Sequence, residues 1–177
     1  MYDLLIKGGT IIDGTGSDRY IGDVAIEGGK IVEIGQNVYT SAQKTIEADG
    51  LLVTPGWVDI HTHYDGQATW DPLLTPSFWH GVTTVIMGNC GVGFAPVAPD
   101  KKDWLIGLME GVEDIPNAAL AEGMSWGWET FPEYLDILEN LPHAIDIGSQ
   151  IAHGPVRAYV MGERGASNEP ATESDIE

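Results

Sequence analysis

Two histidines separated by a single residue, His61 and His63, are the side chains in this sequence best suited to chemistry. They directly follow the largely apolar run 57–60. If that run is a β-strand, both imidazoles point to one face and present their nitrogens side by side, as ligands of one metal ion must. An isolated His-x-His pair is more often a pair of satisfied loop histidines. The carboxyl end of a buried strand is where parallel α/β domains carry their active sites, so the position favours a metal site.

Cys90 is the second candidate ligand. It follows His63 by 27 residues, about one strand-helix-strand crossover, and comes just after the apolar run 82–87. Neighbouring parallel strands would bring the thiol and the imidazoles to one rim, and a thiolate is a good zinc ligand. Two other roles stay open, a small buried apolar residue or a nucleophile, although no Cys-His-Asn signature is visible nearby.

Five further residues are candidates for substrate contacts or for orienting the ligands. Asp59 precedes His61 by two residues and shares its face, where it orients a ligand or serves the backbone at the strand end. Tyr64 and Asp65 follow the histidines at the rim and are expected to face substrate. His153 and Arg157 follow a third apolar run, where they belong to the active site or anchor a loop.

The elements that must position these residues follow from hydrophobic periodicity. Up to about residue 49, short β-branched runs alternate with glycine pairs, which predicts hairpins turning at Gly8-Gly9 and Gly28-Gly29. From residue 51 the pattern changes to strands alternating with helices, which is typical of a parallel α/β domain whose strands are buried on both faces. The predicted strands are 57–60, 82–87 and 144–147, and the predicted helices are 76–80, 104–112 and 134–141.

Composition limits the classes of partner. The chain has 177 residues and a formal net charge of −19, so nucleic acid and anionic membrane surfaces are not expected to bind it. The single cysteine excludes an internal disulfide, and the first residues lack a signal-peptide core, so we expect a cytoplasmic protein. Several acidic residues are expected to form a solvated face: Glu110, Glu113, Asp114, Glu122 and Glu129.

Three motifs together resemble the start of a metal-dependent amidohydrolase. They are the opening segment 3–14, the hairpin 28–34 and Val53-Thr-Pro-Gly-Trp-Val-Asp-Ile-His-Thr-His63. Within that superfamily, the segments 81–96 and 153–162 resemble the D-aminoacylase branch, the N-acyl-D-amino-acid deacylases. The resemblance runs over nearly the whole chain.

The resemblance implies an α/β fold, the N-terminal part of a TIM-like (β/α)8 barrel (53–177) preceded by part of a small β-sandwich (1–52). It implies one or two zinc ions, with His61, His63 and Cys90 as ligands, and a small N-acyl amino acid as substrate. A general-base aspartate is expected beyond residue 177. Three barrel strands do not close a barrel, so this polypeptide alone is expected to be inactive. Hydrolysis of a cyclic amide or a dipeptide, and a non-catalytic metal-binding module, remain alternatives.

Overall fold

The structure is a computed structural model that describes residues 1–113 and 115–177. The chain divides into two compact units, Met1–Pro55 and Gly56–Glu177. The boundary expected from the sequence, between residues 52 and 53, lies inside a short strand of the first unit. The described part of the chain contains no helix that is both long and apolar enough to cross a membrane.

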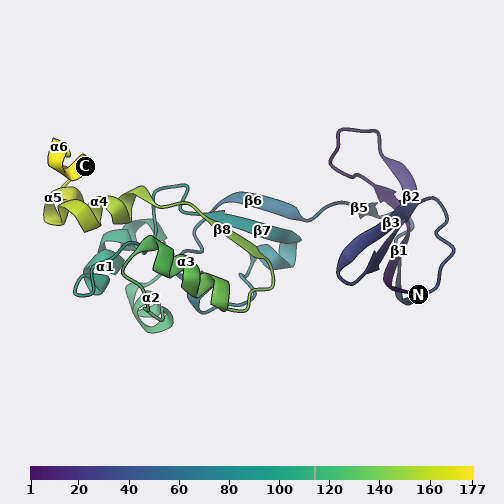
Figure 1. Cartoon of the computed structure of the whole chain (residues 1–177), viewed down its shortest axis with the longest axis horizontal. Helices are drawn as coiled ribbons and strands as arrows, with labels where there is room; N and C mark the ends of the chain where they lie inside the picture. The colour runs from purple at the N-terminus through teal and green to yellow at the C-terminus, as the bar shows by residue number, and fades with distance from the viewer. Residues whose placement is uncertain (114) are drawn as a thin grey trace. The chain divides into compact units, whose positions relative to one another are not determined.

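The first unit is a five-stranded sheet (Figure 1). Its strands lie in the order β3-β2-β1-β4, and β5 also pairs with β1. The pairs β1–β2 and β2–β3 are antiparallel, whereas β4 and β5 run parallel to β1, which the predicted series of hairpins did not include. The strand bounds are β1 Tyr2–Ile11, β2 Tyr20–Glu27, β3 Lys30–Gly35, β4 Ala42–Glu47 and β5 Leu52–Val53.

Only one of the two predicted glycine turns exists. Gly28 and Gly29 both have positive φ (58° and 73°) and join β2 to β3, as predicted. The prediction of a turn at Gly8-Gly9 is wrong, because both residues lie inside β1, where the register with β2 shifts between Ile6 and Gly9. Only Gly8 has positive φ (72°), and one such residue bends a strand into a bulge without reversing it.

The second unit is a parallel sheet of three strands in the order β6-β7-β8, with helices between and after them (Figure 1). It has the mixed α/β character that the sequence predicts. The strands are β6 Trp57–Thr62, β7 Val82–Met87 and β8 Asp146–Ser149. The helices are α1 Lys102–Glu113, α2 Asn117–Gly123, α3 Phe131–Asn140, α4 His153–Met161, α5 Glu163–Ala166 and α6 Glu173–Ile176, with short 3-10 helices η1 Gln67–Thr69 and η2 Ser77–His80.

Two strand predictions need correction. The run 57–60 was expected to be buried on both faces, yet Trp57, Val58 and Ile60 are 61%, 59% and 66% exposed. The reason is that β6 pairs only with β7 and is an edge strand, whereas Val85 in the central strand β7 is fully buried. The third strand begins at residue 146, two residues later than predicted, and Ala144 instead donates its backbone N–H to the Pro72 carbonyl.

The core of the second unit packs the helices and the loop after β7 against the sheet. Its largest fully buried side chains include Tyr134, Phe94 and Leu120. The indole N–H of Trp128 donates to the Phe94 carbonyl at 2.8 Å, and the Tyr134 hydroxyl donates to the Asp65 carbonyl at 2.7 Å. These bonds satisfy buried polar groups and fix the segments that follow β6 and β7.

The expected solvated acidic face is confirmed for Glu110 and Glu122, whereas Glu129 is half-buried. Glu110 and Glu122 are exposed, and Glu129 accepts a hydrogen bond from the Tyr159 hydroxyl at 2.8 Å. The side chain of Glu113 and the whole of Asp114 lie outside the described residues.

Thr130 caps α3, and its loss is expected to destabilise the second unit. Its hydroxyl accepts from the Glu133 N–H, and the Glu133 carboxylate accepts from the Thr130 N–H at 2.8 Å, a reciprocal capping box. We expect Thr130→Ala to lower the free energy of unfolding by about 1 kcal/mol, measured by urea denaturation. Thr172→Ala is the matched control, because Thr172 caps only the four-residue α6, which buries no side chain. Equal losses in the two variants would contradict the assignment.

Candidate metal centre

The end of β6 is held against β7 by two polar side chains. The Thr62 hydroxyl donates to the Ile86 carbonyl at 3.0 Å, and the Asn89 amide donates to the Ile60 carbonyl at 3.4 Å. The register of the two strands shifts between Asp59 and Thr62, so these bonds bridge a stretch where the regular ladder is interrupted. They fix the backbone on which both histidines are carried.

Cys90 lies in a tight turn after β7. Gly88 and Gly91 both have positive φ (83° and 92°), and the Gly91 N–H donates to the Gly88 carbonyl at 3.0 Å. The Cys90 sulfur accepts from the Val92 N–H at 3.4 Å. Glycines at the two positive-φ positions let the chain turn back so that the thiol lies at the strand end.

The turn and the strand end bring together the three residues predicted to hold a metal. The candidate ligand atoms of His61, His63 and Cys90 all lie within 4.8 Å of one another, and the two imidazole centroids are 5.7 Å apart. In a tetrahedral zinc site, ligand atoms are roughly 3.3–3.6 Å apart, which small side-chain rotations would reach. Two imidazoles and a thiol form a donor set that zinc prefers, and His61 and Cys90 are exposed, so an ion has access. The residues present therefore fit zinc.

Three neighbouring candidates, Asp59, Tyr64 and Asp65, have the following hydrogen bonds and burial. The Asp59 carboxylate accepts from the backbone N–H of His61 at 3.2 Å, so it serves the strand end. Tyr64 and Asp65 are both buried, so neither is open to solvent, and a role for them in substrate contacts stays a prediction. The Tyr64 hydroxyl donates to the Ser77 hydroxyl at 2.8 Å, and the Asp65 carbonyl accepts from Tyr134. The chain turns inward directly after His63, which alternation along a strand does not predict.

His153 and Arg157 lie on a helix and not at a strand end. His153 is the first residue of α4 and is exposed, and the next N–H, of Gly154, donates to the Gly91 carbonyl at 2.7 Å. Both residues line a cavity of about 820 Å³ together with Cys90. The Arg157 guanidinium donates to the carbonyls of Gly165 and Glu169, so it anchors the segment after α4, the second of the two roles expected for it.

The loop between His63 and β7 is ordered by Asp71. Its carboxylate accepts from the N–H groups of Leu73 and Thr75, the Thr75 hydroxyl and the Gln67 amide, all within 3.0 Å. Burial raises the pKa of the Asp71 carboxyl, but these hydrogen bonds outweigh burial and lower the pKa to about 2. The sequence predicted only a turn at Asp71, not this network.

Asp71 is expected to make stability depend on pH. A carboxyl whose folded-state pKa lies below its ordinary value of 3.8 contributes stability in full above that value and loses it as the pH falls towards 2. We expect Asp71→Asn to cost about 1–2 kcal/mol at pH 7, and the difference from the parent to disappear near pH 2, in unfolding curves across this range. Asp136→Asn on the exposed side of α3 is the control, and a difference that persists at pH 2 would contradict the assignment.

Thr62 and Asn89 are the residues near this site that sequence reasoning missed. Each lies next to a candidate ligand in the chain, Thr62 between the histidines and Asn89 before Cys90. That adjacency was the available signal. Their partners, the carbonyls of Ile86 and Ile60, are on the other strand and become visible only once the strands are paired.

Known proteins are similar to this chain in both sequence and fold. A family model described as "Amidohydrolase family" matches residues 44–177. The D-aminoacylase of Alcaligenes xylosoxydans xylosoxydans is 35% identical over 170 residues, which is 95% of this chain and 33% of that protein. A solved D-aminoacylase structure, described as having a binuclear metal centre, superposes with a TM-score of 0.78 at 33% identity and covers 99% of this chain and 34% of that one.

A second solved structure contains both a metal and an inhibitor. The N-acyl-D-glutamate deacylase of Bordetella bronchiseptica, complexed with zinc and a phosphonate that mimics the tetrahedral intermediate, superposes with a TM-score of 0.75 at 30% identity. The match covers 98% of this chain and 34% of that one. The chain thus spans about a third of the length of the relatives it matches. With a family model that covers three quarters of its residues, this chain belongs to the amidohydrolase family.

Proposed function

We propose that the protein containing this chain removes the acyl group of an N-acyl-D-amino acid by zinc-dependent hydrolysis, with His61, His63 and Cys90 as zinc ligands. The observation that carries the proposal is the convergence of these three donors within 4.8 Å at the ends of β6 and β7. Two proteins that are similar over nearly the whole of this chain, a D-aminoacylase and an N-acyl-D-glutamate deacylase, support the proposal, the latter being complexed with zinc.

Each of the three residues has a defined task. His61 and His63 donate neutral imidazole nitrogens from one strand end, while Cys90 supplies a thiolate whose charge offsets part of the charge of a divalent cation. When bound, zinc lowers the pKa of a coordinated water to about 7 and polarises the amide carbonyl, so no protein nucleophile is required. Thr62 and Asn89 keep the two strand ends at a fixed separation, which preserves the spacing of the donors.

The rest of the machinery is expected outside residues 1–177. The described residues of the second unit form a three-stranded parallel sheet, and its edge strand β6 exposes Trp57, Val58 and Ile60. We infer that further strands cover this apolar edge and bring the remaining ligands and a general-base aspartate. The expectation that this chain alone is inactive follows, since three donors hold an ion but do not supply the proton acceptor.

A chimaera tests the proposed reaction. Residues 1–177 would replace the corresponding third of the D-aminoacylase of Alcaligenes xylosoxydans xylosoxydans, and hydrolysis of N-acetyl-D-leucine, N-acetyl-L-leucine and hydantoin would be compared. We expect zinc-dependent turnover of the D-substrate that is lost in the Cys90→Ala chimaera. Preferential turnover of hydantoin would assign the chain to cyclic amides, and a folded, zinc-loaded but inert chimaera would favour the metal-binding module.

The 177-residue chain provides a second test that does not depend on the chimaera folding. Bound to the chain, Co²⁺ is expected to show a thiolate-to-metal charge-transfer band that disappears in Cys90→Ala. A spectrum unaffected by that substitution would remove Cys90 from the ligand set and would contradict the proposed centre.

A further inference from the structure

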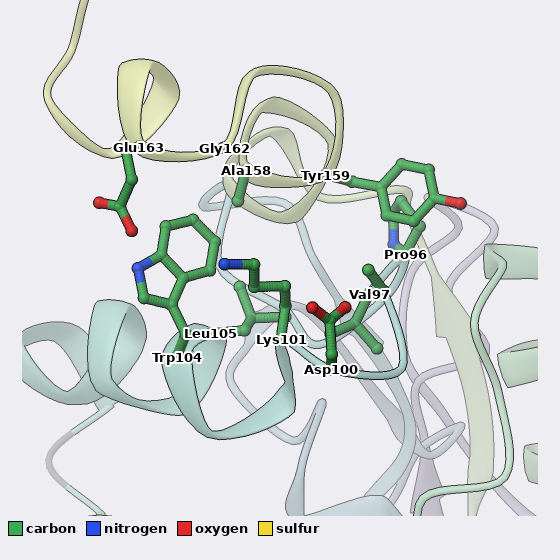
Figure 2. A pocket seen from close by; sticks show the side chains of 11 residues that line it. Pro96, Val97, Asp100, Lys101, Trp104, Leu105, Ala158, Tyr159, Gly162 and Glu163 are labelled. Carbon is green, nitrogen blue, oxygen red and sulfur yellow. The ribbon is translucent and has the colours of Figure 1, made fainter.

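A second cavity lies between the loop before α1, the first turn of α1 and the helices α4 and α5 (Figure 2). Its volume is about 160 Å³. None of the residues that line it is a candidate metal ligand. The walls combine apolar, aromatic and charged side chains, of which the most informative are Lys101, Trp104, Leu105, Ala158, Tyr159 and Glu163.

The size and the floor of this cavity suit a small apolar group. A cavity of about 150 Å³ holds a molecule of the size of benzene, so a branched aliphatic side chain fits. Leu105 and Ala158 form buried apolar surface, and the Trp104 indole lies beside them. Burying an isobutyl group against these side chains contributes favourable free energy without requiring a polar partner.

Charges of both signs are placed around the apolar floor. The Lys101 ammonium points into the cavity and lies 5.7 Å from the centroid of the Trp104 ring (Figure 2). The Glu163 carboxylate lies beside the Trp104 indole (Figure 2). The Asp100 carboxylate lies beside Lys101, on the side away from Trp104 (Figure 2). Within residues 1–113 and 115–177, these three charged side chains form no ion pair or hydrogen bond with another side chain.

We propose that this cavity binds a free α-amino acid with an apolar side chain of about the size of leucine. The ligand's carboxylate pairs with the Lys101 ammonium, its α-ammonium pairs with the Glu163 carboxylate, and its side chain packs on Leu105 and Ala158. A simple anion is disfavoured because the two carboxylates outnumber the one ammonium, and a simple cation would leave the Lys101 ammonium without a partner. The zwitterion is the small ligand that satisfies both signs at once.

Acylation of the ligand should abolish recognition. An N-acyl amino acid lacks the ammonium that would pair with Glu163 and adds bulk to a cavity of about 160 Å³. The cavity therefore selects a free amino acid over its acylated form. A free amino acid is also what the proposed deacylation would release, but the binding inference rests on the cavity alone and stands if that function fails.

Calorimetric titration of the 177-residue chain tests the proposal. Both enantiomers of leucine, N-acetyl-leucine and leucinamide are the probes, and we expect millimolar binding of leucine because the charged groups are partly exposed. Lys101→Met and Glu163→Gln should each weaken leucine binding about five- to tenfold. Lys102→Met is the matched control, since Lys102 lies over a different ring, that of Trp126 at 5.6 Å, and should leave binding unchanged.

The titrations distinguish a site for a zwitterion from a cavity that does not bind one. Weaker binding of both N-acetyl-leucine and leucinamide, together with losses in Lys101→Met and Glu163→Gln, supports the zwitterion site. Equal binding of leucine and N-acetyl-leucine overturns it, because binding would then not depend on the α-ammonium group of the ligand. No saturable heat with leucine, or equal losses in Lys101→Met and Lys102→Met, also overturns it. Circular dichroism of each variant verifies that these exposed substitutions leave the fold intact.

Discussion

Replacing both His61 and His63 with alanine should lower the zinc affinity of the 177-residue chain by about 100-fold or more. Changes to groups that only orient a metal ligand already cost about 10–100-fold, so removing two of three donors exceeds that range. The candidate ligand atoms of His61, His63 and Cys90 lie within 4.8 Å of one another, and no other group of three such side chains with metal-binding spacing occurs among the described residues.

Competition with a chromophoric chelator measures this affinity directly. His80→Ala is the matched control, since His80 is an exposed histidine of the same unit that lies in η2 and outside the cluster. It should leave zinc binding unchanged. A double variant that retains the parent affinity would show that the ion, if bound at all, is held elsewhere, and the proposed centre would be withdrawn.

Gly88→Ala should cost about 3 kcal/mol or more of the free energy of unfolding of the second unit. Gly88 has φ 83°, and a Cβ atom built there would lie 2.1 Å from the Gln150 carbonyl oxygen. That oxygen is backbone and cannot rotate away, so β7 and the segment after β8 must separate. The strain of a positive φ at an alanine and the overlap of its Cβ atom with the Gln150 carbonyl therefore both lower the free energy of unfolding. Because Cys90 follows two residues later, the substitution should also weaken zinc binding.

Gly81→Ala isolates the steric part of this effect. Gly81 has almost the same φ, 82°, but a Cβ atom there would meet only the Trp57 ring at an ordinary 3.5 Å. Gly81→Ala should lower the free energy of unfolding by about 1–2 kcal/mol, which is the cost of placing a residue with a Cβ atom in left-handed backbone. Urea denaturation of both variants and of the parent gives the comparison, and equal losses would contradict the close approach of β7 and Gln150.

Much of the second unit could be predicted from local patterns. The run 82–87 predicted β7 to the residue, and the helical periods at 104–112 and 134–141 identified α1 and α3. These three predictions are correct because the periodicity of apolar side chains and the flanking turn residues are properties of the local sequence. The short helix α2 and the helices α4 and α5 were not predicted, since they are short or begin after an extended residue without a side-chain cap.

The errors share a different cause. The prediction that β6 is buried failed because burial depends on which strands lie beside it, and β6 has one neighbour. The burial of Tyr64 and Asp65 was not predicted either, because their hydrogen-bond partners Ser77 and Tyr134 are 13 and 69 residues away. A pattern within a short stretch of sequence does not predict contacts between residues so far apart in the chain.

The sequence by itself determined the candidate ligands, the alternation of strands and helices in the second unit and the family resemblance, because spacing within a strand and the length of one crossover are local geometry. Only the tertiary structure decided that the thiol and imidazoles lie within 4.8 Å, that His153 begins a helix, and that Lys101 and Glu163 face one cavity. Those facts depend on how distant segments pack. Packing is set by the whole set of long-range contacts, which no single window of sequence contains.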